Sequence, residues 1–301
     1  MRKLSLPSKK ERHRYFGSVD PIKGTKPTNK ECMKDLQNIE QDYFFNIDQV
    51  GIKNLTYPVK INSSLQPFKQ QSVGSFTLTT GLNREQKGIN MSRLPEVLHK
   101  FYQEGLQMDF STLKDLTKCL TERMQQRSST IQVAFPWFFE RKSPQMGLTG
   151  LMKADIQLQL TYEEGLDWSE KVKMTTLTTT LCPCSKEISE YSAHNQRGVV
   201  TVEIETYKHT SFPENFKEEL LEIIESNASA RLHPVLKRPD EKKVTEQAYE
   251  NPRFVEDLIR LIAADLYLTN WVQAFKIECK NEESIHQHDA YAQMEYRKKN
   301  L

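Results

Sequence analysis

Apolar and polar residues alternate along most of the chain, and this alternation predicts β-strands. Successive side chains of a strand face opposite sides of the sheet, so a period of two marks a strand with one buried face. Pro136 falls inside one such pattern and suggests an edge strand, because proline has no N–H to donate to a neighbour. The strands expected from the pattern cover residues 55–61, 76–82, 131–137, 154–162, 168–181, 200–204, 275–279 and 290–296.

Other apolar residues recur with the period of about 3.6 that is typical of a helix. For the first helix, Ser92 is a candidate N-cap and Gly105 a stop. The second helix is expected to be capped near Ser111, and Pro252 is expected to open the last one. The charged stretch 238–246 is interpreted as a connection. The expected helices cover residues 94–101, 113–124, 216–224 and 255–266.

The order strand-strand-helix-helix-strand-strand therefore occurs twice, which predicts an α+β fold made of two ββααββ modules. Each half is expected to form a four-stranded antiparallel sheet with two helices on one face. The expected organisation is an irregular arm over residues 1–45, one module over 46–165 and a second over 166–301. Open sheets leave unpaired edges, so an oligomer that covers them is expected.

Composition narrows the class of protein. The chain has 301 residues, of which 37% are hydrophobic and 27% charged, as in a soluble globular protein. No apolar run is long enough to span a bilayer. Five cysteines without an export signal favour the reducing cytoplasm. A net charge of +2 gives no argument for a nucleic-acid partner, and the basic N-terminal stretch is interpreted as a solvated arm.

The densest group of reactive side chains lies in residues 182–198, between two expected strands. Cys182, Cys184 and His194 allow two chemistries there: a Cys/His nucleophile pair or a metal site with thiolate and imidazole ligands. The simpler alternative is that the thiols are small buried side chains and the histidine is a hydrogen-bonded core residue. The number of polar groups in so short a loop favours a site.

Phosphate-binding motifs of the common kinds are absent from the sequence, but residues 87–93 precede a helix. Ser92 and that helix N-terminus could bind an anion, or could simply form a capped helix start. Glu256 lies one turn before Arg260. It could form a surface ion pair with that arginine, or accept hydrogen bonds from a purine or pterin edge.

Two further stretches carry candidate ligands. His286 and His288 lie in a hairpin connection and would share a face if they were on a strand; two histidines there are more often surface residues than ligands. In the charged stretch 238–246, Glu241 is a possible hard ligand, although nothing local distinguishes it from Asp240 or Glu246.

Five short stretches, taken together and in this order, form a specific signature. They read Leu-Cys-Pro-Cys-Ser-Lys-Glu-Ile-Ser from residue 181, Ala-His-Asn-Gln-Arg-Gly from 193, Lys-Arg-Pro-Asp-Glu from 237, Asn-Pro-Arg-Phe-Val-Glu-Asp from 251 and Glu-Ser-Ile-His-Gln-His-Asp from 283. With residues 17–28 and 87–93, they resemble the bacterial GTP cyclohydrolases of type IB. The resemblance extends over about residues 15–296.

This resemblance implies a tunnelling fold, in which ββααββ modules form a barrel on oligomerisation. It implies conversion of GTP to 7,8-dihydroneopterin triphosphate and formate, the first step of tetrahydrofolate biosynthesis. It also implies a homotetramer with active sites between subunits, and a divalent metal, Mn²⁺ or Zn²⁺, that activates water for attack on guanine C8.

By the same resemblance, the expected metal ligands are Cys182, His194 and Glu241. His286 is the expected proton carrier beside the metal, and with Cys182 the expected catalytic pair. Glu256 is expected to anchor guanine.

The triphosphate needs cations, and Lys186, Arg197 and Arg93 are the candidates, with Ser92 beside them. Asn90 departs from the family pattern, which often has histidine there, and the role of Cys184 stays open.

The sequence leaves two alternative functions to compare. A tunnelling-fold nitrile reductase would use a cysteine nucleophile with NADPH, but its cofactor motif is missing from this sequence. A non-enzymatic RNA-binding module would use the basic arm, but the chain is nearly neutral and interleaves few aromatic with basic residues.

Overall fold

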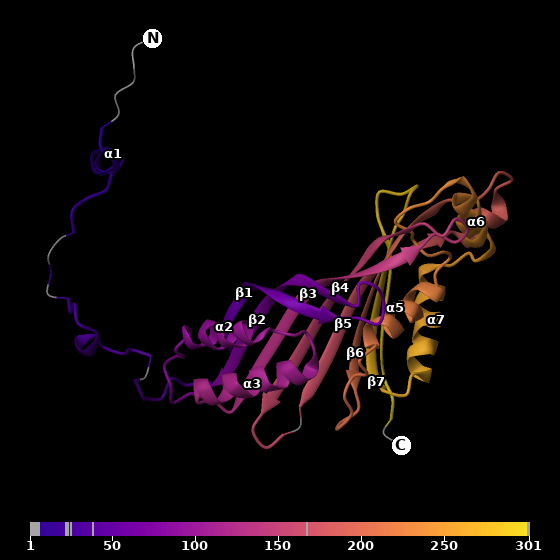
Figure 1. Ribbon diagram of the computed structural model, residues 1–301. Coiled ribbons are helices and arrows are strands. Elements are labelled where there is room, and N and C mark those ends of the chain that lie inside the picture. Colours follow the sequence, from indigo (N-terminus) through magenta and orange to yellow (C-terminus); the bar gives the residue numbers. More distant parts are fainter. Residues whose placement is uncertain (1–6, 22–23, 25, 38, 167, 300–301) are drawn as a thin grey trace, which may run out of the picture.

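The computed structural model describes residues 7–21, 24, 26–37, 39–166 and 168–299. Its centre is an eight-stranded sheet in which the strands follow one another in chain order, every neighbouring pair antiparallel (Figure 1). The strands are β1 (Ile47–Asn62), β2 (Lys69–Leu82), β3 (Ser128–Lys142), β4 (Thr149–Glu163), β5 (Ser169–Leu181), β6 (Asn195–Thr206), β7 (Val272–Glu282) and β8 (Ala290–Arg297).

The longer connections between strands of this sheet contain helices. In the first half, two helices connect the second and third strands, as the alternation of patterns predicted (Figure 1). In the second half, three helices connect the corresponding strands, one more than predicted. The α+β class is therefore confirmed. The helices are α1 (Lys9–Tyr15), α2 (Arg93–Glu104), α3 (Phe110–Met124), α4 (Pro183–Ile188), α5 (Phe216–Ser226), α6 (Arg238–Glu250) and α7 (Val255–Leu268).

The prediction of two separate four-stranded sheets was wrong. β4 and β5 pair directly, from Asp155 opposite Thr175 to Thr161 opposite Ser169, so both halves belong to one continuous sheet. The turn between these strands contains the expected module boundary at residues 165 and 166. Pairing the two inner edges satisfies their backbone groups within the chain and leaves β1 and β8 as the edge strands.

One apolar core runs beneath the helices of both halves. Leu158, Val172, Val202 and Ile277 lie on four neighbouring strands, and each is fully buried in this core. Between them, alternate strand positions face the other side of the sheet and carry polar residues such as Gln159 and Lys173, which are only half-buried. The sheet therefore has an apolar face under the helices and a polar face opposite.

Several helix boundaries differ from the sequence prediction. Gly105 does end α2, with a φ of 96° that glycine adopts without strain. Ser92 occupies the N-cap position of α2, but its side chain makes no capping bond. α3 is capped by Asp109 rather than near Ser111, because the Asp109 carboxylate accepts from Thr112 N–H at 2.7 Å.

The prediction from Pro136 that β3 is an edge strand was also wrong, because β3 lies between β2 and β4. Backbone pairing of β2 with β3 nevertheless stops at Ser75 opposite Ala134, just short of the proline. Beyond that point a side chain replaces the backbone, as Ser72 Oγ donates to Pro136 O at 2.9 Å. Pro136, which has no N–H, therefore lies in a part of β3 that is no longer paired with the backbone of β2.

The stretch 238–246, predicted as a connection, lies in helix α6. Its apolar period is too weak to see in the sequence, because only Asp240 and Ala248 of this helix are buried. Asp240 fixes the start of α6: its carboxylate accepts from Lys237 N, Gln145 N and Met146 N at 2.8–3.0 Å. These bonds attach α6 to the turn between β3 and β4.

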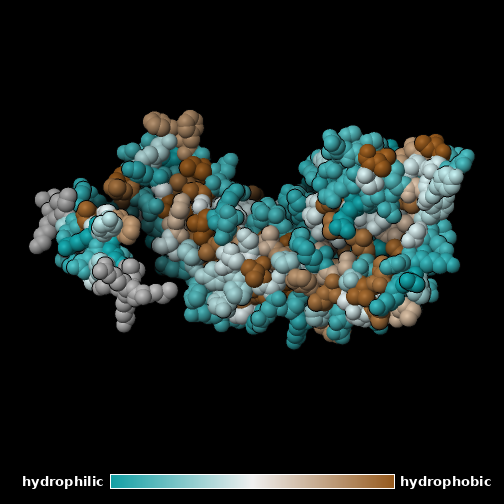
Figure 2. Space-filling view, turned by 90° about the horizontal axis from the view of Figure 1, so that it is seen from above, coloured by the Kyte–Doolittle hydropathy of each residue, from teal (hydrophilic) through white to brown (hydrophobic). Residues whose placement is uncertain are grey.

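The N-terminal arm extends away from the sheet (Figure 1). It was expected to be irregular, yet it contains α1, which begins with a capping box between Ser8 and Glu11. The prediction for residues 17–28 falls partly outside the described residues. Figure 2 shows apolar side chains uncovered on the arm, where Tyr15, Phe16 and Val19 are exposed. Within the described residues, no helix combines the length and apolar character needed to cross a membrane.

Replacing Asp240 by asparagine is expected to lower the melting temperature at pH 7. Burial opposes ionisation of Asp240, but the three backbone N–H donors and Ser143 outweigh it and lower its pKa to about 2. A pKa below the unfolded value of about 3.9 stabilises the fold above that value, and this stabilisation is lost as the pH falls towards 2. The difference in melting temperature between wild type and Asp240→Asn should therefore shrink as the pH falls below about 4.

Thermal denaturation followed by circular dichroism at several pH values measures this difference. Glu246→Gln is the matched control, because Glu246 is an exposed residue of the same helix that pairs only loosely with Lys242, at 3.7 Å. Equal melting temperatures for wild type and Asp240→Asn at pH 7 would contradict the role given to the three N–H bonds.

Candidate functional site

The turn between β5 and β6 brings Cys182 and His194 together. Cys182 N–H donates to His194 O at 3.1 Å, and His194 N–H donates to Ser185 Oγ at 3.2 Å. Ser185 Oγ in turn donates to Cys182 O at 3.1 Å. The loop predicted here contains the short helix α4, with Cys182 Sγ accepting from Ser185 N at 3.5 Å and Pro183 at its first position.

A cavity of about 290 Å³ opens beside this turn and joins two segments that are distant in the sequence. Cys182 lines it, and so does Glu256 in the first turn of α7. The two are held together by the backbone, because Arg253 N–H donates to Leu181 O at 3.0 Å. The cavity is lined by Cys182, Gln196, Arg253, Phe254, Val255, Glu256, Asn281, Glu283, Ala290 and Tyr291.

The His194 ring is oriented by acceptors on one of its nitrogens. His194 Nδ1 lies 2.9 Å from Gln196 Oε1 and 3.9 Å from Glu283 Oε2. The side chains of His194 and Glu283 are only 15% and 12% exposed, so these polar groups meet where little water competes. Gln196 is anchored in turn, because its Nε2 donates to Thr180 Oγ1 at 3.1 Å.

Glu241 lies on the face of α6 that packs against this turn. Val244 and Ala248 follow it at helical spacing on the same face, and they pack with Leu181 and Ala193. Glu241 itself is exposed. Within the described residues, no group of three His, Cys, Asp or Glu side chains lies close enough to hold a metal ion.

The donor types at the turn nevertheless fit a divalent metal. Cys182 and His194 supply a thiol and an imidazole on adjoining backbone, the pair that suits zinc or iron. Cys182 lines the cavity, and the only carboxylates among the described residues that line it are Glu256 and Glu283. Cys182 and His194 can therefore supply two ligands of such a site.

The other expected site residues are dispersed. Lys186 Nζ donates to Tyr249 O at 2.6 Å and lies 4.2 Å from the centre of the Tyr249 ring, so here it fastens α4 to α6. Arg197 directly follows Gln196 on β6, so it faces the opposite side of the sheet. His286 and His288 lie in the exposed turn before β8, not on a strand, and their rings stack with centroids 5.0 Å apart.

Ser92 and Arg93 lie at the start of α2, which packs on β1 at the other end of the sheet from the Cys182 turn (Figure 1). Arg93 Nη1 donates to Arg123 O at 3.2 Å there. A single copy of the chain therefore does not bring these two residues to the cavity beside Cys182.

Sequence reasoning missed Gln196, Asn281 and Glu283, and the strand pattern held a signal for the first two. Gln196 is in phase with the buried Val200 and Val202 on β6, and Asn281 with the buried Ile277 and Cys279 on β7. Both are buried polar residues at positions where the alternation calls for apolar ones. A polar residue in the apolar phase at the end of a strand is a site signal.

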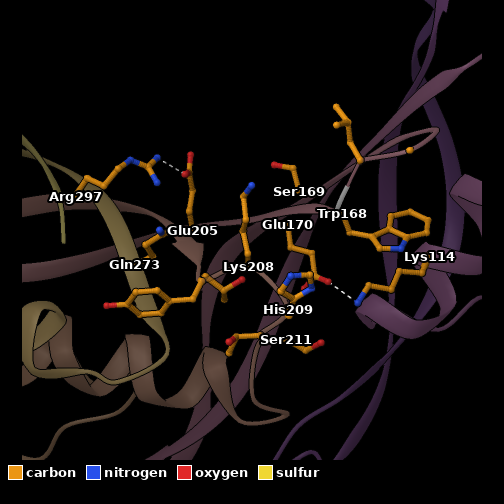
Figure 3. Close-up of a pocket in the computed structure, with 15 residues that line it drawn as sticks. Lys114, Trp168, Ser169, Glu170, Glu205, Lys208, His209, Ser211, Gln273 and Arg297 are labelled. Carbon is orange, nitrogen blue, oxygen red and sulfur yellow. Dashed lines mark hydrogen bonds and ion pairs between the residues drawn. The ribbon is translucent and has the colours of Figure 1, made fainter. Parts of the chain in front are cut away.

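A larger cavity, of about 490 Å³, lies at the opposite ends of β5 and β6 (Figure 3). Its charged side chains are largely committed to ion pairs: Lys114 with Glu170 at 2.6 Å, and Glu205 with Lys171 at 2.6 Å and with Arg297. Burial opposes ionisation of Glu205, but its two cationic partners outweigh it and lower its pKa. Among the described residues lining this cavity there is no cysteine, and its ion pairs fasten α3 to β5 and β6 to β8.

Comparisons with known proteins identify the family of this chain. The family model described as type I GTP cyclohydrolase folE2 matches residues 33–292. GTP cyclohydrolase FolE2 of Bacillus licheniformis is 57% identical over 297 residues, covering 99% of both chains. The protein of the same name from Bacillus subtilis is 58% identical over 289 residues, covering 96% of this chain and 95% of the other.

Among solved structures, uricase from Arthrobacter globiformis matches with a TM-score of 0.56, covering 84% of this chain and 94% of the other. At 8% sequence identity this likeness concerns the fold alone. It is consistent with the α+β fold of this chain. On the extent of the family match and the identity to its members, the chain belongs to the type I GTP cyclohydrolase folE2 family.

Proposed function

We propose that this chain is a GTP cyclohydrolase of folate biosynthesis and that the reaction takes place in the cavity between Cys182 and Glu256. The observation that carries the proposal is that one cavity is lined both by Cys182, whose backbone N–H is bonded to His194 O, and by Glu256 on the first turn of α7. The relatives named GTP cyclohydrolase FolE2, 57% and 58% identical, support the activity.

In this proposal Glu256 recognises guanine. Its carboxylate can accept two parallel hydrogen bonds, from guanine N1–H and from the exocyclic amine, whereas adenine offers no such pair. The alternative was that Glu256 forms an ion pair with Arg260. In the structure, Arg260 Nη1 lies 3.9 Å from Asp257 Oδ1 instead. Glu256 stays exposed at the cavity wall.

The proposed reaction opens the imidazole ring of guanine at C8. Addition of one water at C8 and cleavage of the ring give a formamide, a second water releases formate, and closure of the pterin ring after rearrangement of the ribose loses one water. A divalent ion, manganese or zinc, would supply the activated water and polarise the reacting centre.

In this proposal Cys182, His194 and Glu241 hold the ion. His286, in the turn that follows Glu283, carries protons to the ring nitrogen. The triphosphate is bound by cations, for which Lys186, Arg197 and Arg93 remain the candidates.

We further propose that the active enzyme is a homotetramer. β1 and β8 leave open edges, and the face of the sheet opposite the helices carries polar side chains that could line a barrel. Ser92 and Arg93 lie too far along the sheet to reach the Cys182 cavity of their own chain, so they would have to serve the site of a neighbour.

The activity is tested by incubating the purified protein with GTP and Mn²⁺ and measuring pterin fluorescence after oxidation. Formate and the fluorescent pterin should appear together, one molecule of formate for each molecule of pterin. Consumption of NADPH with a nitrile substrate, without pterin formation from GTP, would instead support the reductase alternative and overturn the proposal.

Cys182→Ala is expected to lose bound metal and activity together, because it removes the only soft ligand of the proposed set. Elemental analysis after gel filtration measures the metal, and Cys119→Ala, a change of a cysteine on α3, is the matched control. Full metal occupancy in Cys182→Ala would show that this thiol is not a ligand.

Sedimentation is expected to show an assembly with the mass of four chains. The monomer mass is 35.1 kDa, so the two states are well separated. A fully active species of monomer mass at low protein concentration would exclude the need for a partner chain at the site.

Glu256→Gln is expected to reduce turnover of GTP by roughly a hundredfold or more, since the amide keeps one acceptor and loses the charge. Metal content and melting temperature should stay near wild type, because the side chain is exposed. The neighbouring Asp257→Asn tests helix capping instead, as Asp257 accepts from Phe254 N–H at 3.1 Å. Near-normal GTP kinetics with unchanged rejection of ATP in Glu256→Gln would show that Glu256 does not bind guanine and is only a surface residue of the helix.

A further inference from the structure

We propose that Gln196 is a positioning residue that holds His194 in the tautomer with its proton on Nδ1, so that Nε2 presents its lone pair to the metal. This inference deepens the proposed function and rests on His194 being a ligand. It assigns a task to a buried glutamine that the sequence signature did not single out.

Gln196 is held from both ends of its amide. It lies opposite Thr180 in the β5–β6 pairing, and both side chains are buried, at 8% and 0% exposed. Nε2 donates to Thr180 Oγ1 at 3.1 Å, which leaves Oε1 facing His194 Nδ1 at 2.9 Å. An amide oxygen accepts only, so Nδ1 must carry the hydrogen of that bond.

Glu283 gives an independent reason for this assignment. A glutamine amide could be turned round, and a threonine hydroxyl would tolerate either orientation. Glu283 Oε2, however, lies 3.9 Å from the same His194 Nδ1. An ionised carboxylate also accepts only, so a proton on Nδ1 faces two acceptors, whereas a bare Nδ1 would set its lone pair against a negative charge.

The consequence concerns the other ring nitrogen. A neutral imidazole carries one N–H, so a proton fixed on Nδ1 leaves Nε2 with the lone pair that a metal requires. The His194 backbone is already fixed by bonds to Cys182 and Ser185. Gln196 adds control of the ring itself, which is the part played by partners outside the ligand set in metal sites.

The test compares two substitutions at position 196. Gln196→Met keeps a side chain of similar length and removes the acceptor, whereas Gln196→Glu restores an acceptor for Nδ1–H. Two-bond ¹H–¹⁵N spectra of the metal-free protein report the tautomer of His194, with the His194→Ala spectrum for assignment. Competition with a zinc chelator reports the affinity for Zn²⁺.

Wild type should show the Nδ1–H tautomer. Gln196→Met should lose this preference and bind Zn²⁺ about 10- to 100-fold more weakly, and Gln196→Glu should recover most of the affinity. Gln157→Met, on the opposite face of the sheet, is the matched control and should change neither reading.

An Nε2–H tautomer in the wild-type protein would overturn the proposal. This measurement needs no variant, so the proposal can still be tested if Gln196→Met fails to fold. Unchanged zinc affinity in a folded Gln196→Met protein that has lost the tautomer would equally overturn the link to the metal. If the proposed metal site were wrong, the result would differ. Wild type and Cys182→Ala would then bind Zn²⁺ equally well, while His194 would still show the Nδ1–H tautomer.

Discussion

The register of β5 against β6 is the constraint on which the candidate site depends. Leu181 lies opposite Asn195 and Thr180 opposite Gln196, so the turn between them has a fixed length and closes on the bond from Cys182 N–H to His194 O. A slip of one residue would move Gln196 to the other face of the sheet. The thiol, the imidazole and the glutamine would then no longer meet at one point.

That register is held from both sides of β5. β4 pairs with β5 only as far as Thr175, and beyond it the same edge is taken by residues that follow α5. Ser229 N–H donates to Thr179 O at 3.0 Å, and Ser229 Oγ accepts from Leu181 N–H at 3.0 Å. The end of β5 is therefore hydrogen-bonded on both edges, although its pairing with β4 stops at Thr175. This double pairing gives the Cys182 turn a rigid base.

The regular elements were predictable where burial follows a simple period, and this accounts for the strands and for α2, α3, α5 and α7. The sequence could not show that β4 pairs with β5. The alternation of apolar and polar residues in each strand is the same whether or not the two strands are hydrogen-bonded to each other. Nor could it show α6, whose order comes from Asp240 accepting three backbone N–H groups and from packing on the Cys182 turn. These are long-range contacts, and they leave almost no apolar pattern.

For the site, residue type pointed to Cys182, His194 and Glu256, and the fold brings the first two together and opens one cavity to Cys182 and Glu256. Ser92 and Arg93 belong to the same sequence signature but to the far end of the sheet, a separation that no local pattern reveals.

The glutamine at position 196 shows how the strand pattern itself carries the chemistry. A valine there would complete the apolar phase of Val200 and Val202, whereas a buried amide without partners costs about 1–3 kcal/mol. Thr180 offsets that cost at one end of the amide and His194 at the other. Because His194 can satisfy Gln196 Oε1 only through a proton on Nδ1, the packing of the strand and the ligand behaviour of the histidine are fixed by the same hydrogen bond.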